Sequence, residues 1–212
     1  MELAQLVQAA WPKLSNEQVA RVARFHQLLA QENEVQNLTR LISPTDFVEG
    51  HLLDVRELLE SGVLDFPAAD LGSGGGVPGL LAATIRPDSW VLIESEQRKA
   101  QFLQKSSQEL GLPNVKVLAD RGEKVIASVK LGSVVARAVG SVDKIYAWLM
   151  KSSTWNTLVL LKGPGWDEEW AAFSKSKHGK HLELVSSHAY TVGPENKRRV
   201  IVKLRRVPRG TK

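Results

Sequence analysis

Hydrophobic positions in the first 62 residues recur at helical spacing. Residues 3–10 form one apolar stripe, which ends at Trp11-Pro12. The spacing of Ser15 and Gln18 matches a capping box and predicts the start of a second helix. A third helix is expected to begin at Ser43-Pro44. We therefore expect residues 1–62 to form an N-terminal helical segment that packs on the rest of the chain.

From residue 63 to residue 212 the pattern changes to short apolar runs that alternate with helical stretches. Five runs predict strands, namely Pro67–Leu71, Trp90–Glu94, Val115–Leu118, Ser133–Arg137 and Thr157–Leu161. Helices are predicted at Pro78–Ile85, Gln97–Leu110 and Val142–Met150. Strands that alternate with helices indicate a mostly parallel sheet covered on both faces.

The last two apolar runs, Leu182–Val192 and Arg199–Arg205, lie too close together for a helical crossover. They should therefore pair as an antiparallel hairpin at the edge of the sheet. The predicted fold is α/β, with a seven-stranded, mostly parallel sheet and an antiparallel final hairpin. The N-terminal helical segment precedes it.

A glycine-rich turn, AADLGSGGGVPG at residues 68–79, follows the first predicted strand. Its glycines allow positive φ angles and leave no Cβ between the main chain and a ligand. Pro78 suits the first position of the next helix, whose free N–H groups attract electron-rich groups. Such a turn is typical of a site for a cofactor that contains adenosine.

Two cofactors fit the spacing of this turn. Gly74, Gly76 and Gly79 match the dinucleotide pattern G-x-G-x-x-G, with Glu94 placed to bind a ribose. The pattern D-x-G-x-G-x-G is typical of S-adenosylmethionine sites in Rossmann-like class I methyltransferases, and here it consists of Asp70, Gly72, Gly74 and Gly76. The acid at its start favours S-adenosylmethionine over a nicotinamide dinucleotide.

Ligands of such sheets bind beyond the carboxyl ends of the strands. Polar groups follow the five predicted strands in turn, at Asp70, Glu94, Asp120–Glu123, Arg137 and Lys162–Gly165. The carboxylate of Glu94 can accept both ribose hydroxyls, and residues 120–123 are placed to border an adenine. We expect these groups to line one site.

Composition and charge narrow the choice of partners. The apolar fraction of 43% suffices for a core, and zero cysteines exclude disulfides and cysteine-ligated metals. No long apolar span and no basic–apolar leader is present, so we expect a cytoplasmic protein without a membrane partner. Residues 197–212 carry eight Lys or Arg and no acid, whereas the other residues carry 20 basic and 23 acidic side chains. This basic segment fits binding to a phosphate backbone.

Several short motifs follow one another along the chain. They are N-L-T at Asn37–Thr39, H-x-L-D at His51–Asp54, DLGSGGGVPG at Asp70–Gly79, R-x-E at Arg121–Glu123, A-R-A at Ala136–Ala138, L-K-G at Leu161–Gly163 and Arg199 before V-I-V-K. With this ordered set, the chain resembles the bacterial RsmG/GidB family from about Trp11 to Lys203. The resemblance implies an S-adenosylmethionine-dependent methyltransferase that acts on N7 of a guanine in the 530 loop of 16S rRNA.

The resemblance also implies site residues. Further cofactor contacts are expected at Gly72, Val77, Gly122, Glu123 and Arg137. From their positions at strand ends, and not from the resemblance, Arg137 and Lys162 are the expected catalytic residues, because a cationic side chain can hold guanine O6 or a phosphate. Contacts with RNA are expected from Arg121, Lys162, Arg198 and Arg199. The expected partner is 16S rRNA in the small ribosomal subunit or its precursor, bound by a monomer.

Three positions depart from the pattern of the family. Gly132-Ser133 stands where an aromatic residue and Asp often precede the fourth strand, and Gly122 replaces a more usual small apolar or polar residue. The basic C-terminus is short, at Pro208–Lys212. These departures concern contacts with the substrate more than the cofactor site.

The expected reaction needs no general base, since guanine N7 carries a free lone pair. The task of the site is then to align the methyl group with N7. Methylation of pyrimidine C5 requires a cysteine, which the chain lacks, and the motif typical of exocyclic-amine methylation is absent after the fourth predicted strand. The five histidines make no convincing metal site, so no metal is expected.

Other functions would use part of the same pattern. An NAD-dependent oxidoreductase would share the glycine-rich turn and Glu94, although the N-terminal helices and the basic segment argue against it. A ribosome-associated protein that binds the cofactor with little turnover would share the whole pattern. A methyltransferase of small molecules or proteins also stays open from the residues alone.

Overall fold

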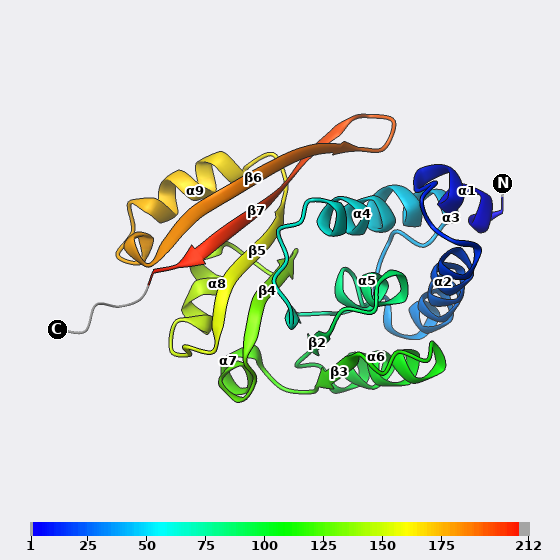
Figure 1. Cartoon of the computed structure of the whole chain (residues 1–212), viewed down its shortest axis with the longest axis horizontal. Coiled ribbons are helices and arrows are strands. Elements are labelled where there is room, and N and C mark those ends of the chain that lie inside the picture. Colours follow the sequence, from blue (N-terminus) through cyan, green and yellow to red (C-terminus); the bar gives the residue numbers. More distant parts are fainter. Residues whose placement is uncertain (1, 208–212) are drawn as a thin grey trace.

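The centre of the molecule is one mixed β-sheet. In this computed structural model, which describes residues 2–207, seven strands lie in the order β3-β2-β1-β4-β5-β7-β6 (Figure 1). They are β1 (Ala68–Leu71), β2 (Trp90–Ile93), β3 (Val115–Leu118), β4 (Leu131–Arg137), β5 (Trp155–Lys162), β6 (Leu182–Val192) and β7 (Lys197–Arg206). The first five run parallel, and β7 is antiparallel to both β5 and β6. The predicted seven-stranded sheet with an antiparallel final hairpin is confirmed.

Helices cover both faces of this sheet (Figure 1). One side holds α1 (Leu3–Ala10), α2 (Asn16–Gln36), α3 (Pro44–Phe47), α4 (Leu53–Glu60), α5 (Gly79–Ile85) and α6 (Gln97–Glu109). The other side holds α7 (Gly122–Val125), α8 (Val142–Leu149) and α9 (Trp166–Ser174). Neighbouring residues of a strand therefore face two different cores, as Ala68 and Ala69 do.

The N-terminal helices share their core with the sheet. Phe25 of α2 and Leu80 of α5 belong to the same buried cluster as Ala68 of β1. The Gln18 side chain donates to the carbonyl oxygen of Ile85 at 2.7 Å, and the predicted capping box at the start of α2 is present. The boundary suggested between residues 62 and 63 stays a prediction.

Some elements differ from those predicted. A π-turn, η1 (Val48–Leu52), interrupts the expected third helix between α3 and α4. Pro78 is the N-cap residue, one position before α5, and the N–H of Gly79, the first residue of this helix, donates to Asp70. Helices α7 and α9 have no counterpart in the prediction. Within residues 2–207, no helix is long and apolar enough to span a membrane.

Candidate functional site

The glycine-rich turn joins β1 to α5 and is fixed to the end of β2. The N–H groups of Gly72 and Ser73 both donate to the carbonyl oxygen of Ile93, at 2.9 and 3.1 Å. Gly72 has a φ of 74°, a conformation that favours glycine. The backbone of the turn is thereby held at the carboxyl ends of β1 and β2, where the sequence predicts it.

Asp70 stabilises this turn from inside the protein. Its side chain is 1% exposed, and Oδ2 accepts the Gly79 N–H at 2.9 Å. Its carbonyl oxygen accepts the Ser73 hydroxyl at 2.8 Å. Burial raises the pKa of Asp70 to about 7, and the hydrogen bond from Gly79 opposes this shift. Asp70 therefore shapes the turn, and its direct contact with a cofactor stays a prediction.

Glu94 ties the turn to the segment after β2. Its Oε2 accepts the N–H of Gly74 and its Oε1 accepts that of Glu96, both at 2.9 Å. A Cβ at Gly76 would lie 3.0 Å from the Leu80 side chain, and Val77 packs against the core under α1 to α6. These predicted cofactor residues all support the turn, and their contact with a ligand stays a prediction.

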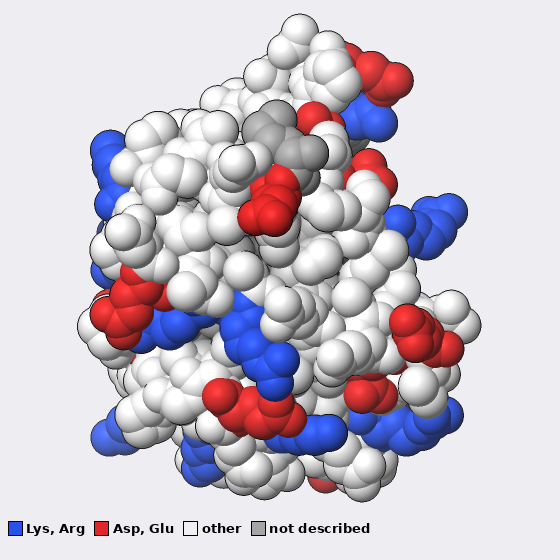
Figure 2. Space-filling model, turned by 90° about the vertical axis from the view of Figure 1, so that its right-hand side faces the viewer, with Lys and Arg blue, Asp and Glu red and all other residues white. Residues whose placement is uncertain are grey.

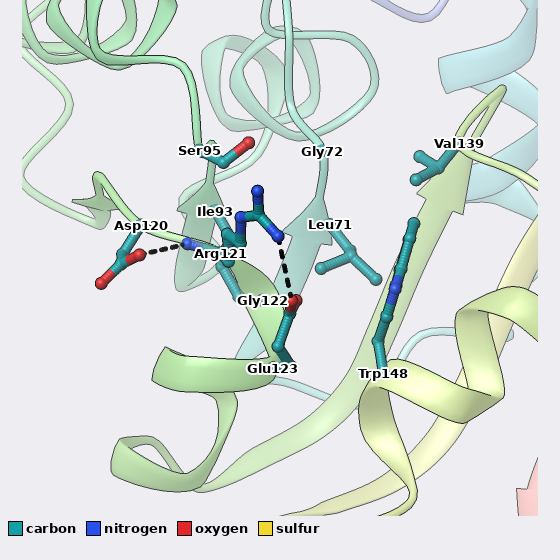
Figure 3. Close-up of a pocket in the computed structure, with 10 residues that line it drawn as sticks. All are labelled: Leu71, Gly72, Ile93, Ser95, Asp120, Arg121, Gly122, Glu123, Val139 and Trp148. Atoms are coloured by element: carbon teal, nitrogen blue, oxygen red, sulfur yellow. Dashed lines mark hydrogen bonds and ion pairs between the residues drawn. The ribbon is translucent and has the colours of Figure 1, made fainter.

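A cavity of about 250 Å³ opens beside the turn, at the carboxyl ends of β1, β2 and β3. Its lining includes Gly72, Gly122 and Glu123, so three predicted cofactor contacts come together here (Figure 3). We call this space the strand-end cavity. It also includes Trp148 of α8 and Val139, which follows β4.

The strand-end cavity fits the adenosine part of a cofactor. Ile93 and Trp148 supply apolar surface, and the indole ring of Trp148 stands along one side of the cavity (Figure 3). A Cβ at Gly72 would lie 3.1 Å from the Val139 side chain, and one at Gly122 would require the Leu71 side chain to shift, so both glycines are closely packed. Flat apolar surface with a few polar groups at the rim is the usual surrounding of a purine.

Arg121 lies at the rim of this cavity. Its N–H donates to Asp120 Oδ1 at 2.7 Å, and its guanidinium lies 4.0 Å from the Glu123 carboxylate (Figure 3). The side chain is 71% exposed. The predicted contact of Arg121 with RNA stays a prediction, at a position next to the expected cofactor site.

A second cavity, of about 550 Å³, lies at the carboxyl ends of β4 and β5. Its charged lining consists of Arg137, Lys162, Lys197, Arg198, Arg199 and one carboxylate, Asp54. We call it the basic cleft. It brings four of the predicted catalytic and RNA-binding residues together, whereas their contacts with a substrate stay predictions.

The charge of the basic cleft is a local feature. The side of the molecule formed by α1 and α2 shows Lys and Arg intermixed with Asp and Glu (Figure 2). Arg24 of α2, for example, pairs with Glu109 of α6 at 2.9 Å. A surface of mixed sign attracts a polyanion weakly, so the basic cleft is the better surface for nucleic acid.

Arg137 reaches from the end of β4 toward the N-terminal helices. Its Nη2 donates to the Gly50 carbonyl oxygen and to His51 Nδ1, each at 3.0 Å, and its Nε lies 3.3 Å from Asp54 Oδ2. Its Nη1 is buried and has no hydrogen-bond partner within the described part of the chain. Arg137 also lines the basic cleft, so this unpaired donor lies in a residue of the cleft wall, although the Nη1 atom itself is not exposed there.

Asp54 is the centre of a buried group that we call the Asp54 cluster, with Arg137, Arg199 and Tyr190. Its carboxylate has no solvent exposure and lies against the guanidinium groups of Arg137 and Arg199. The Tyr190 hydroxyl donates to Oδ1 at 2.8 Å. Burial raises the pKa of Asp54, and the two arginines oppose this shift. The cluster connects α4, β4, β6 and β7.

His51 supports Arg137 from the π-turn η1. Burial and the charge of Arg137 lower the pKa of His51 to about 3, so the ring is neutral near pH 7. Nδ1 of the ring lies 3.0 Å from Arg137 Nη2 and 3.1 Å from the Gly50 carbonyl oxygen, and Nε2 lies 3.1 Å from Thr39 Oγ1. The N-L-T and H-x-L-D motifs thus meet at Arg137.

Lys162 holds the segment that follows β4. Its Nζ donates to the carbonyl oxygen of Gly140 at 2.7 Å and pairs with Glu169 Oε1 at 2.8 Å. Glu169 also accepts the N–H of Val142 at the start of α8. The observed contacts of Lys162 are therefore structural, and a role toward the substrate stays a prediction.

The segment Arg137–Gly140 borders both cavities. Arg137, Ala138 and Gly140 line the basic cleft, whereas Val139 lines the strand-end cavity. Ala138 has a φ of 57°, which is uncommon for a residue other than glycine. A group bound in the strand-end cavity and a group bound in the basic cleft therefore contact neighbouring residues of one short segment.

Sequence reasoning missed Trp148, Tyr190 and the part played by Asp54. A tryptophan on a helix or a tyrosine on an edge strand has the same sequence pattern whether it packs the core or lines a site. Asp54 did carry a signal, because it shares a helix face with the apolar Leu58, and an acid at such a position is usually paired. Trp166 is buried and stacks on Trp170, with ring centroids 5.6 Å apart, so this pair packs the core.

Asp70 should give the protein a measurable pH dependence of stability. The folded-state pKa of Asp70, about 7, lies above the ordinary value of 3.8. The contribution of Asp70 to the free energy of unfolding is therefore complete below about pH 4 and is lost as the pH rises through 7. Asp70→Asn cannot ionise. The free energy of unfolding of the wild type, minus that of Asp70→Asn, should therefore fall by about 4 kcal/mol from about pH 4 to about pH 8 in urea denaturation. A difference that stays constant over this range would contradict the assignment.

Comparison with known proteins agrees with this geometry. The sequence profile described as rRNA small subunit methyltransferase G matches residues 18–200. A protein named ribosomal RNA small subunit methyltransferase G from Solibacter usitatus is 33% identical over 178 residues, which cover 80% of this chain and 83% of the relative. One of the same name from Rhodopirellula baltica is 37% identical over 174 residues, covering 80% and 74%.

Solved structures with low sequence identity share the fold. M. capricolum TrmK in complex with S-adenosyl-homocysteine superposes with a TM-score of 0.50 at 10% identity, covering 66% of this chain and 61% of that one. A single-residue mutant of MtNAS in complex with S-adenosylmethionine gives a TM-score of 0.54 at 15% identity, covering 87% and 72%. The family itself follows from the profile match and the two relatives, which confirm the predicted resemblance: the chain belongs to the rRNA small subunit methyltransferase G family, also named GidB.

Proposed function

We propose that this chain transfers a methyl group from S-adenosylmethionine to N7 of a guanine in the 530 loop of 16S rRNA. The observation that carries the proposal is the meeting of the strand-end cavity and the basic cleft at residues 137–140. Membership of an rRNA methyltransferase family supports the class of reaction. The small ribosomal subunit or its precursor is the partner in this proposal, and the protein acts as a monomer in the cytoplasm.

The strand-end cavity would hold the adenosine of the cofactor. Bound there, S-adenosylmethionine supplies an electrophilic methyl group. Ile93 and Trp148 offer flat contact to the adenine, and the Glu123 carboxylate offers an acceptor. Gly72 and Gly122 keep the cavity free of side-chain atoms. The chain's own task at this end is binding and orientation.

The basic cleft would hold the RNA without abstracting a proton. The His51 ring is neutral and both of its nitrogens are engaged, and the Asp54 carboxylate is engaged by Arg137, Arg199 and Tyr190. Neither group is placed as a base, which suits an acceptor that already carries a lone pair. The Nη1 of Arg137 has no partner in the described residues, and a shift of the side chain that exposes it to the cleft would let it bind guanine O6 or a phosphate.

Methylation of the small subunit tests the proposal directly. Small subunits from a strain without the gene should gain N7-methylguanosine at one position of the 530 loop when incubated with the protein and labelled S-adenosylmethionine. Mass spectrometry of nuclease fragments locates the modified nucleotide. Label in another RNA, in protein or at another atom of the base would overturn the assignment, and no label at all would favour a binding protein with little turnover.

Trp148 should matter for cofactor affinity. Trp148→Ala removes one flat side of the strand-end cavity and should weaken S-adenosylmethionine binding about ten-fold, as measured by calorimetry. Trp148→Phe is the matched control, because it keeps a flat ring, and should bind within about three-fold of the wild type. Equal affinities of all three proteins would show that the adenine lies elsewhere.

Arg137 should matter more for transfer than for cofactor binding. Arg137→Ala removes a cationic side chain that lines the basic cleft and should reduce methyl transfer about 100-fold or more, because the guanine is no longer held in place. Calorimetry with S-adenosylmethionine should show a much smaller change, and circular dichroism checks the fold. Equal losses of transfer and of cofactor affinity would assign Arg137 to the cofactor alone.

A further inference from the structure

We propose that a small cavity beside the basic cleft binds the nucleotide adjacent to the methylated guanine, with the phosphate of this nucleotide on Arg198. This inference rests on the proposed function, because it requires RNA in the basic cleft. The cavity has a volume of about 140 Å³ and lies between α9 and the β6–β7 hairpin. We call it the flanking cavity, and its lining includes Gly163, Trp166, Asp167, Ser187 and Arg198.

The flanking cavity and the basic cleft meet along one rim. Gly163, Pro164, Arg198 and Arg199 line both of them. A Cβ added at Gly163 would meet no atom within 4 Å, so the rim is open at this point. An RNA strand that places its guanine in the basic cleft can therefore place the next nucleotide in the flanking cavity.

Arg198 differs from the other cations of β7. Four of these pair with carboxylates, namely Lys197 with Glu195, Arg199 with Asp54, Lys203 with Asp65 and Arg205 with Glu183. The guanidinium of Arg206 lies over the Trp155 ring, 5.3 Å from its centroid. Arg198 is exposed and makes no side-chain hydrogen bond or ion pair with any residue from 2 to 207.

The alternation of side chains along β7 places Arg198 on the face of the sheet that borders the flanking cavity. Successive side chains of a strand point to opposite faces, and Arg199 points toward Asp54 on α4. The Arg198 side chain therefore projects from the opposite face of the sheet. This face also carries Val200 and is covered by α8 and α9. A guanidinium with all its donors free is well suited to a phosphate, which it can bind through two parallel hydrogen bonds.

The rest of the lining fits a base. Neither the Asp167 carboxylate nor the Ser187 hydroxyl forms a side-chain hydrogen bond within the described residues. A carboxylate repels a phosphate but accepts a hydrogen bond from the exocyclic amino group of a base. The phosphate then lies at Arg198 and the base at Asp167. Uracil offers only its ring N3–H in place of an exocyclic amino group, so the flanking cavity should favour cytidine over uridine.

Binding and turnover on small subunits without the modification test the contact of Arg198. Arg198→Ala should weaken binding of the subunit about five- to ten-fold and raise KM more than it lowers kcat. The slope of log affinity against log salt concentration should become shallower by about one. Arg198→Lys should recover the salt slope, since it restores the charge without the bidentate geometry.

Arg205→Ala is the matched control. It removes another exposed arginine of β7, which is paired with Glu183. The affinity of Arg205→Ala for the small subunit should stay within about two-fold of that of the wild type. Wild-type affinity and salt slope in Arg198→Ala would overturn the inference. An equal loss in Arg205→Ala would also overturn it, because general attraction to the hairpin would then explain the binding.

Changing the neighbours of the target guanine tests the base. Uridine placed on one side of the guanine should reduce turnover by the wild type, and Asp167→Ala should no longer distinguish uridine from cytidine there. Two results would overturn the proposed role of Asp167. One is wild-type turnover that does not depend on the nucleotide on either side of the guanine, and the other is a preference of Asp167→Ala for cytidine over uridine that equals that of the wild type. If the wild-type protein bound small subunits without methylating them, the proposed function would fail. The comparison of subunit binding by the wild type and by Arg198→Ala would still test the contact of Arg198 with RNA.

Discussion

The site depends on one buried carboxylate, that of Asp54. Removing a carboxylate from water is costly unless other groups of the protein satisfy its charge and its lone pairs. Here two guanidinium groups and a phenol do so, and they come from β4, β6 and β7, whereas Asp54 itself lies on α4. The loss of one partner would leave charge uncompensated in the interior. The N-terminal helices are therefore part of the functional site, since they fix Arg137 at the end of β4.

Periodic patterns predicted the architecture well and predicted local irregularities poorly. The alternation of strands and helices was sufficient to predict the parallel sheet, because helices cover both faces of such a sheet, and the short spacing of the last two runs predicted the final hairpin. Strand β4 begins at Leu131, two residues before the predicted start, where it pairs with Trp155 of β5. The sequence of one strand alone does not show where its pairing with a neighbouring strand begins. The π-turn η1 likewise has the apolar spacing of an ordinary helix, so only the structure reveals it.

Position at the strand ends also predicted which residues would gather, but not what each would touch. Asp70 and Glu94 stand at the predicted places, yet their oxygens accept backbone N–H groups of the glycine-rich turn. An acid beside glycines has the same appearance in a sequence whether it binds a ligand or supports the loop. Trp148 reaches the strand-end cavity from a helix distant in sequence from the glycine-rich turn. Asp70 in the turn already favoured a methyltransferase over a nicotinamide enzyme, and the family match confirms that choice.

The segment Arg137–Gly140 is anchored at both ends, by the Asp54 cluster and by the bond from Lys162 to the Gly140 carbonyl. Two ligands that share such a wall are not energetically independent, because each one restricts the conformations left to the other. Linkage then requires reciprocity: the factor by which cofactor changes the affinity for RNA equals the factor by which RNA changes the affinity for cofactor. If the spent cofactor fits this wall less well than S-adenosylmethionine, the protein binds the ribosomal substrate more weakly after the reaction, by the ratio of the two coupling factors.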